Sequence, residues 1–179
     1  MNTDIKKTRT FQILTIMHIL AWVAFVGFMI EAGAVLVSYA VSIVKPETAM
    51  NLYKGLDLYS LRQFNGWHYT GAVSFIVALS LMKAYVSFLV IKTLSKMNLL
   101  NPFTMEVAKK MEKISYVLLE IWIVSMLKNA HTGWLLKTTG GLQGGWVNGD
   151  FIFMAALVFV LSQIFKRGVE IQSENELTV

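Results

Sequence analysis

The sequence contains no cysteine and only three histidines among its 179 residues. The absence of cysteine excludes disulfides, thiolate metal sites and cysteine nucleophiles, and it leaves the redox compartment open. The histidines, His18, His68 and His131, are scattered along the chain and do not have the spacing of a metal site. No nucleophile and base have the paired spacing that a membrane hydrolase needs. We therefore expect no metal ion, no cofactor and no catalytic residue, and we predict that the protein is not an enzyme.

Charged side chains are also scarce compared with apolar ones. Hydrophobic residues make up 55% of the chain and charged residues 15%, and the mean hydropathy is +0.56. These values exceed what a soluble domain tolerates. The net charge is +5, but the basic residues lie in short clusters beside apolar runs, as they do at the flanks of membrane spans. We expect a lipid bilayer as the main surroundings and no direct binding of nucleic acid.

Four apolar runs are candidates for membrane-spanning helices, because crossing a hydrocarbon core of about 30 Å takes about 20 helical residues. The first run is longer than a bilayer requires, so we expect it to tilt or project outward. It is also too long for the apolar part of a cleaved signal peptide. The sequence predicts a single all-α domain over residues 1–179, a four-transmembrane-helix bundle. Its spans are residues 11–44, 69–94, 114–130 and 151–165, followed by a tail over 166–179.

The distribution of lysine and arginine predicts the orientation, because basic loops resist export across a polarised membrane. With the N-terminus inside, ten basic residues fall on the cytoplasmic side and five on or near the outer side, while Lys83 lies within a span. We therefore predict that both termini are cytoplasmic. The inner set is Lys6, Lys7, Arg9, Lys92, Lys96, Lys109, Lys110, Lys113, Lys166 and Arg167, and the outer set is Lys45, Lys54, Arg62, Lys128 and Lys137.

A short amphipathic lead-in precedes the third span. Pro102 and Phe103 form a turn, and Thr104 can N-cap a helix that continues into the span. Met105 and Ala108 would share one face of this helix, and its lysines would lie beside the anionic inner leaflet. Two interpretations stay open, a membrane-surface anchor and a docking surface for a cytoplasmic partner.

The outer loops carry weaker signals. Residues 57–64, DLYSLRQF, fit either a short strand or an interfacial helix, because their apolar and polar residues alternate imperfectly. The glycine-rich stretch over 140–149 lacks the Gly-Lys-Ser/Thr ending of a phosphate-binding loop. We expect a flexible turn there.

The tail after the fourth span changes from basic to acidic. It contains enough apolar residues to bind a partner, and a frayed tail and a docking segment are equally compatible with it. Together with the lead-in turn, it provides the candidate docking residues Pro102, Phe103, Lys166, Arg167, Glu174, Glu176 and Leu177.

Charged residues inside spans are costly, so each one is a candidate for function or for structural pairing. Lys83 lies about 16 Å from the inner end of its span, and Glu120 about 9 Å from the inner end of its own, at a rise of about 1.5 Å per residue. Because a lysine side chain can snorkel over part of this difference, an ion pair between them is plausible. His18 and Gln163 also lie in the inner half. We predict an intramembrane polar cluster of these four residues that holds the bundle together, with a proton or ion pathway as the competing hypothesis.

Glu31 and Lys128 form a second candidate pair at similar height on the outer side. Both side chains could instead lie at the water interface. As for the inner cluster, structural pairing and an ion pathway are the two hypotheses. A transporter usually has broken helices or internal repeats, and neither is evident in the sequence.

The lead-in turn and the ending FIFMAALVFVLSQIFKRGVEIQSENELTV resemble a known family. This is a bacterial four-span membrane family classified as domain-of-unknown-function family 2975, and the likeness is specific over residues 101–113 and 151–179. The resemblance implies a multi-pass protein of the bacterial inner membrane. Members are often encoded beside small helix-turn-helix regulators, which implies a membrane component that holds or informs a cytoplasmic transcription factor. The matching positions of the closing pattern are Phe165, Lys166, Arg167, Gly168, Glu176, Leu177, Thr178 and Val179.

Our leading hypothesis is a non-enzymatic scaffold or sensor that acts through protein contacts, with a cytoplasmic helix-turn-helix regulator or another membrane protein as its partner. The first alternative is a small transporter or proton pathway that uses Glu31, Lys83 and Glu120. The second alternative is an accessory subunit of a larger envelope complex.

Overall fold

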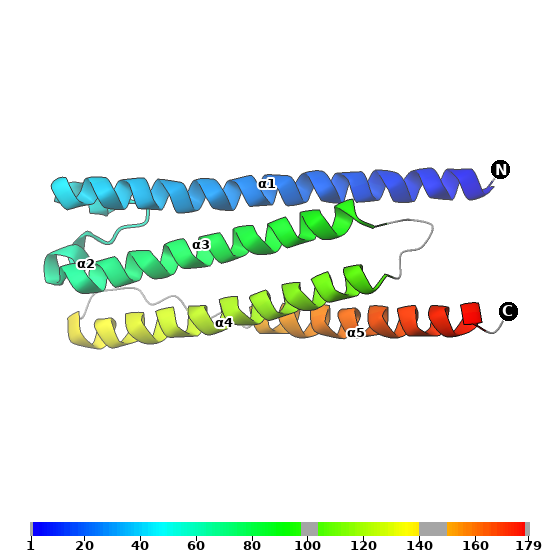
Figure 1. The fold of residues 1–179 in the computed structure, drawn as a ribbon. Coiled ribbons are helices and arrows are strands. Elements are labelled where there is room, and N and C mark those ends of the chain that lie inside the picture. The colour runs from blue at the N-terminus through cyan, green and yellow to red at the C-terminus, as the bar shows by residue number, and fades with distance from the viewer. Residues whose placement is uncertain (1, 98–103, 140–149, 178–179) are drawn as a thin grey trace. The chain divides into compact units, whose positions relative to one another are not determined.

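The computed structural model describes residues 2–97, 104–139 and 150–177, and these residues contain helices and no strand. The all-α prediction is therefore confirmed for this part of the chain (Figure 1). The predicted turn at Pro102 and Phe103 and the one over 140–149 lie outside it. The helices are α1 (Asn2–Val44), the 3₁₀ helix η1 (Pro46–Asn51), α2 (Tyr59–Phe64), α3 (Gly66–Ser95), α4 (Met105–Thr139) and α5 (Asp150–Leu177).

Three of these helices are long and apolar enough to cross a membrane. The corresponding segments are Phe11–Val44, Gly66–Ser95 and Asp150–Glu174. The predicted span over 114–130 lies within α4, which does not reach the same apolarity, because it carries charged residues both within and just before that span. A fourth crossing therefore stays a prediction.

The chain divides into two compact units. The first, here the terminal unit, comprises Met1–Phe25, Tyr85–Glu120 and Gly149–Val179. The second, here the cap unit, comprises Val26–Ala84 and Ile121–Asn148. Helices α1, α3 and α4 each contribute residues to both units. The prediction of one four-span domain over the whole chain stays a prediction.

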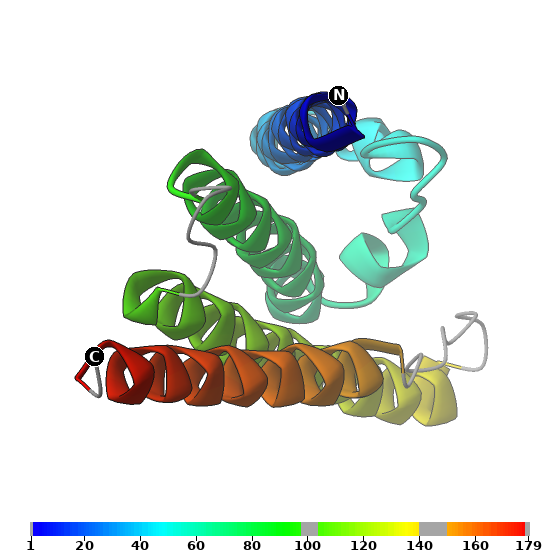
Figure 2. The ribbon, with the colours of Figure 1, turned by 90° about the vertical axis from the view of Figure 1, so that its right-hand side faces the viewer.

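In the terminal unit, the first part of α4 packs along α5 (Figure 2). Helix α4 starts where its sequence predicts, because the hydroxyl oxygen of Thr104 accepts a hydrogen bond from the backbone N–H of Val107 at 3.3 Å. The lead-in is the first part of α4 and continues into the predicted span without a break. Val107 and Ala108 are buried, whereas Met105 is exposed.

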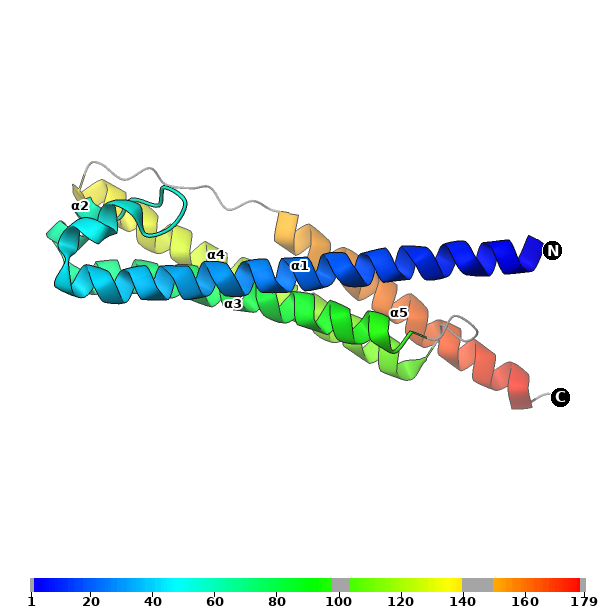
Figure 3. The ribbon, with the colours of Figure 1, turned by 90° about the horizontal axis from the view of Figure 1, so that it is seen from above.

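In the cap unit, the segment between α1 and α3 folds into η1 and α2 at the Val44 end of α1 (Figure 3). Residues 59–64 are helical, which resolves the choice between strand and helix. The guanidinium of Arg62 donates a hydrogen bond to the carbonyl oxygen of Ile43 at 3.1 Å. This bond satisfies an orphan carbonyl in the last turn of α1. The core of the unit consists of Val35, Ala49, Leu52, Leu61, Tyr69, Val73, Val77 and Leu135.

Helix α1 presents most of its apolar side chains outward. Only 6% of its most apolar 18-residue window is buried, and the exposed fractions of Ile16, Leu20 and Val23 are 57%, 60% and 64%. In water, such a surface would be a large apolar patch, which soluble monomers rarely expose. The helix is therefore suited to contact lipid tails or another apolar helix.

Candidate functional site

One cluster of charged groups in the terminal unit lies where α3 ends and α4 begins. The carboxylate of Glu106 lies 2.8 Å from the ammonium of Lys96 and 3.0 Å from that of Lys110. Hydrogen bonds from these two lysines hold the pKa of Glu106 below its ordinary value. Lys110 also donates a hydrogen bond to the carbonyl oxygen of Lys92, at 3.3 Å, near the end of α3. These contacts tie the two helix ends together.

A third ion pair joins α4 to α5. The Nζ atom of Lys166 lies 2.8 Å from the Oε1 atom of Glu112, and both side chains are about three-quarters buried. This hydrogen bond lowers the pKa of the Glu112 carboxyl. The amide of Gln163 donates to the same oxygen at 3.5 Å. Sequence reasoning missed Glu112, although its place as a lone acid between Lys110 and Lys113 was an available signal.

Three of the four members of the predicted intramembrane cluster have other partners, and that of Gln163 is Glu112. His18 accepts a hydrogen bond from the indole N–H of Trp22 at 3.1 Å, within α1. The ammonium of Lys83 lies 5.8 Å from the centre of the Phe28 ring. Glu120 is exposed. Lys83 belongs to the cap unit and the other three residues to the terminal unit, and their association stays a prediction.

The predicted docking residues fall into three groups. Pro102 and Phe103 lie outside the residues that the structure describes, as do the side chains of Glu176 and Leu177. Lys166 is engaged by Glu112. The last group is exposed on α5, where Arg167 pairs with Glu170 at 2.7 Å, one turn further along, and Glu174 follows. Residues 166–177 are thus the end of a helix, where the sequence left open a frayed tail.

His68 and His131 meet in the cap unit, although 63 positions separate them in the sequence. The Nδ1 atom of His68 lies 3.2 Å from the Nε2 atom of His131. Other aromatic rings lie beside the pair. The centre of the Phe75 ring is 6.0 Å from that of His131, and the centre of the Trp134 ring is 5.2 Å from that of His68. Burial, followed by the charge of His68, lowers the pKa of His131. At this distance one ring nitrogen can donate a hydrogen bond to the other, and the charged form of His131 is disfavoured.

Glu31 and Lys128 line one open pocket of about 340 Å³ in the cap unit. Within the described residues, no ion pair of 4 Å or less joins the two. Lys54, from the loop between η1 and α2, adds a second ammonium group. It has a φ of +47°, a left-handed conformation that costs a non-glycine residue about 1–2 kcal/mol. The full lining is Glu31, Val35, Tyr53, Lys54, Leu56, Ile76 and Lys128.

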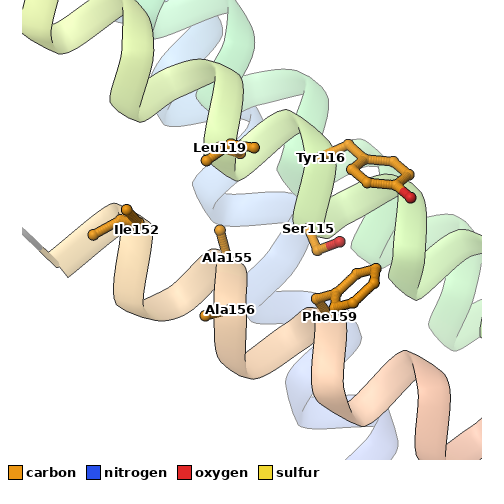
Figure 4. Close-up of a pocket in the computed structure, with 7 residues that line it drawn as sticks. All are labelled: Ser115, Tyr116, Leu119, Ile152, Ala155, Ala156 and Phe159. Carbon is orange, nitrogen blue, oxygen red and sulfur yellow. The ribbon is translucent and has the colours of Figure 1, made fainter.

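A separate groove of about 280 Å³ lies between α4 and α5 in the terminal unit (Figure 4). Its surface is almost entirely apolar. The hydroxyl of Ser115, one of two in the lining, already donates to the carbonyl oxygen of Glu112 at 2.6 Å. The groove is therefore suited to hold an apolar group, and its lining contains no acid–base pair. Its lining is Ser115, Tyr116, Leu119, Ile152, Ala155, Ala156 and Phe159.

Among the described residues, no group of three or more histidine, aspartate or glutamate side chains is arranged to hold a metal ion. The three apolar helices and the dispersed charged pairs define the chain as a helical protein with membrane-type helices. A family model described as "Protein of unknown function (DUF2975)" matches residues 59–179, and the chain belongs to this family. The match includes both segments on which the sequence resemblance was based. No curated protein and no solved structure matches the chain.

Proposed function

We propose that the protein is a four-span protein of the bacterial inner membrane, with both termini in the cytoplasm, and that it acts without catalysis by binding a small cytoplasmic regulator. The observation that carries this proposal is the length of α5. This helix continues without a break from its apolar part to Leu177, so the acidic end of the chain is a preformed helix. A preformed helix loses less conformational entropy on binding than a frayed tail does.

The distribution of basic residues supports an even number of crossings. Helices α1, α3 and α5 contain the three segments long and apolar enough to cross a membrane, and the predicted span over 114–130 lies within α4. If α4 crosses the membrane as α1 does, four spans bring the C-terminus back to the cytoplasmic side, in agreement with the excess of basic residues there.

The end of α5 has the properties of a helix that binds in a groove. Its first turn beyond the apolar part is held to α4 by the ion pair between Lys166 and Glu112. Beyond that point Glu170, Ile171 and Glu174 are exposed, so acidic and apolar groups are both accessible. A basic DNA-binding module would complement this surface, and its release would then compete with DNA.

The test is a binding measurement with the full chain in nanodiscs and the purified helix-turn-helix regulator encoded beside a member of this family. We expect a chain ending at Gly168, and a Glu170→Gln/Glu174→Gln variant, to bind at least about tenfold more weakly. Glu47→Gln, which removes an exposed acid from η1 of the cap unit, is the matched control. Equal binding by the intact and shortened chains would show that the end of α5 is not the contact.

The exposed apolar side of α1 favours a second candidate, an accessory subunit of a larger envelope complex. The predominantly exposed apolar window of this helix could pack against another membrane protein. Purification in a mild detergent separates the two candidates. Stoichiometric co-purification of an envelope complex that survives truncation at Gly168 would favour the accessory subunit over the regulator-binding protein.

A further inference from the structure

The pocket of the cap unit combines charges of both signs from three separate segments. Glu31 comes from α1, Lys54 from the loop before α2, and Lys128 from α4. Val35 belongs to the core of the unit and Leu56 packs against that core, so the apolar part of the lining is continuous with the core. An apolar lining with a few polar or charged groups is the usual composition of a small-molecule site.

The charged groups share the pocket without neutralising one another directly. No ion pair within 4 Å joins Glu31 to Lys54 or to Lys128 among the described residues. Lys54 and Gly55 both have positive φ, +47° and +81°, and a strained non-glycine residue is more common at binding sites than elsewhere. The carboxylate is therefore available to a positive group, and the ammonium groups to a negative one.

The depth of the pocket points to lipid. At a rise of about 1.5 Å per residue, Glu31 lies about 30 Å along α1 from Phe11, where the apolar run begins. Ile76, which also lines the pocket, lies about 28 Å along α3 from Ser95 by the same rise. Both distances are close to the thickness of a hydrocarbon core, about 30 Å. In the proposed orientation, the pocket is therefore level with the headgroups of the outer leaflet.

We propose that this pocket binds the zwitterionic headgroup of phosphatidylethanolamine. Glu31 accepts hydrogen bonds from the primary ammonium of the headgroup, and Lys54 and Lys128 donate to its phosphate. The volume of about 340 Å³ admits a headgroup, while the acyl chains remain in the bilayer beside α1. Phosphatidylglycerol offers the same phosphate without the ammonium, so its headgroup leaves the carboxylate unpaired.

The test compares the two lipids, with identical acyl chains, by native mass spectrometry of the full chain released from mixed micelles. We expect the wild-type protein to retain phosphatidylethanolamine about threefold to tenfold better than phosphatidylglycerol, the range for one partly exposed charge-assisted hydrogen bond. Glu31→Gln should abolish this preference. Lys128→Gln should weaken the retention of both lipids. Lys45→Gln, an exposed lysine outside the pocket, should change neither.

A competition experiment with soluble O-phosphoethanolamine tests whether the ligand is a lipid or a free metabolite of the same chemistry. We expect it to displace the lipid only at concentrations far above those of the lipid, because it lacks the bilayer anchor. Tight binding of the soluble compound without lipid retention would overturn the lipid assignment. An equal retention of both lipids by the wild type, or an unchanged preference in Glu31→Gln, would overturn the site.

Glu31→Asp provides a second variant in case Glu31→Gln folds poorly. It keeps the negative charge on a shorter side chain, so we expect a reduced but measurable preference for phosphatidylethanolamine. A preference that is the same with glutamate, aspartate and glutamine would contradict the proposal. Because the pocket and the end of α5 are in different units, loss of lipid selectivity and loss of regulator binding can be scored independently.

Discussion

The ammonium of Lys166 lies 2.8 Å from the carboxylate of Glu112, although 54 positions separate the two residues in the sequence. This contact fixes the register of α5 against α4 at the point where α5 leaves its apolar part. The same carboxylate also accepts a hydrogen bond from Gln163. Two residues that the sequence assigned to separate roles, docking and an intramembrane cluster, therefore share one partner.

Removing this ion pair should loosen α5. We expect Lys166→Met to lower the melting temperature in detergent by about 1–3 °C, because the pair is partly exposed and chains of this size respond weakly to such losses. Lys109→Met, at an exposed position on α4, is the control. The double exchange Glu112→Lys/Lys166→Glu should recover most of the loss. If it melts no higher than the single variants, the contact does not stabilise the protein.

The carboxylates of the terminal unit should make the protein sensitive to acid. The pKa values of Glu106 and Glu112 are held below the ordinary 4.5 by hydrogen bonds from lysines. Their contribution to stability is thus complete above pH 4.5 and is lost as the pH falls through the lowered values. Melting temperatures measured across this range should decline less steeply in Glu112→Gln than in the wild type. Parallel curves for the two proteins would contradict this assignment.

The histidine pair should produce a second pH dependence at milder acidity. Burial lowers the pKa of His131 below its ordinary 6.5, so the unfolded chain takes up a proton before the folded chain does. Stability should therefore fall as the pH decreases below 6.5, down to the pKa of the folded state. His131→Phe, which keeps an aromatic ring beside Phe75, should remove this component from the melting curves. A dependence that persists in this variant would have to come from another group.

The proposed function predicts no transport through the intramembrane charges. In proteoliposomes, we expect proton and ion flux at the level of empty vesicles, and no change in Lys83→Met or Glu120→Gln. A loss of thermal stability in both variants would support the predicted structural pair. Flux above background that either substitution abolishes would instead favour the pathway that includes Glu31.

The number of crossings can be read from cysteine labelling, because the chain has no native cysteine. We expect Thr48→Cys to react with a membrane-impermeant maleimide in intact spheroplasts, and Ser173→Cys to react only after permeabilisation. If α4 does not cross, three spans leave residue 173 on the same side as residue 48. Labelling of both positions from outside would therefore exclude the four-span arrangement.

Local signals explain the predictions that the structure confirms. The N-cap at Thr104 and the continuous helix after it depend only on neighbouring residues, since a cap is satisfied within one turn. Neighbouring residues alone could not decide between strand and helix over residues 57–64. A helix of six residues is too short to show a clear period of apolar residues. Burial of Leu61 in the core of the cap unit accompanies the helical form.

Apolar run length and charge distribution, read from the sequence alone, determined that this is a helical protein with membrane-type helices. They suffice because lipid requires the backbone of each spanning segment to satisfy its own hydrogen bonds. Only the tertiary structure showed that Lys166 meets Glu112, that His68 meets His131, and that Glu31 and Lys128 share a pocket with Lys54. Those contacts depend on the rotation and register of one helix against another. The spacing of residues along the sequence does not specify either of them.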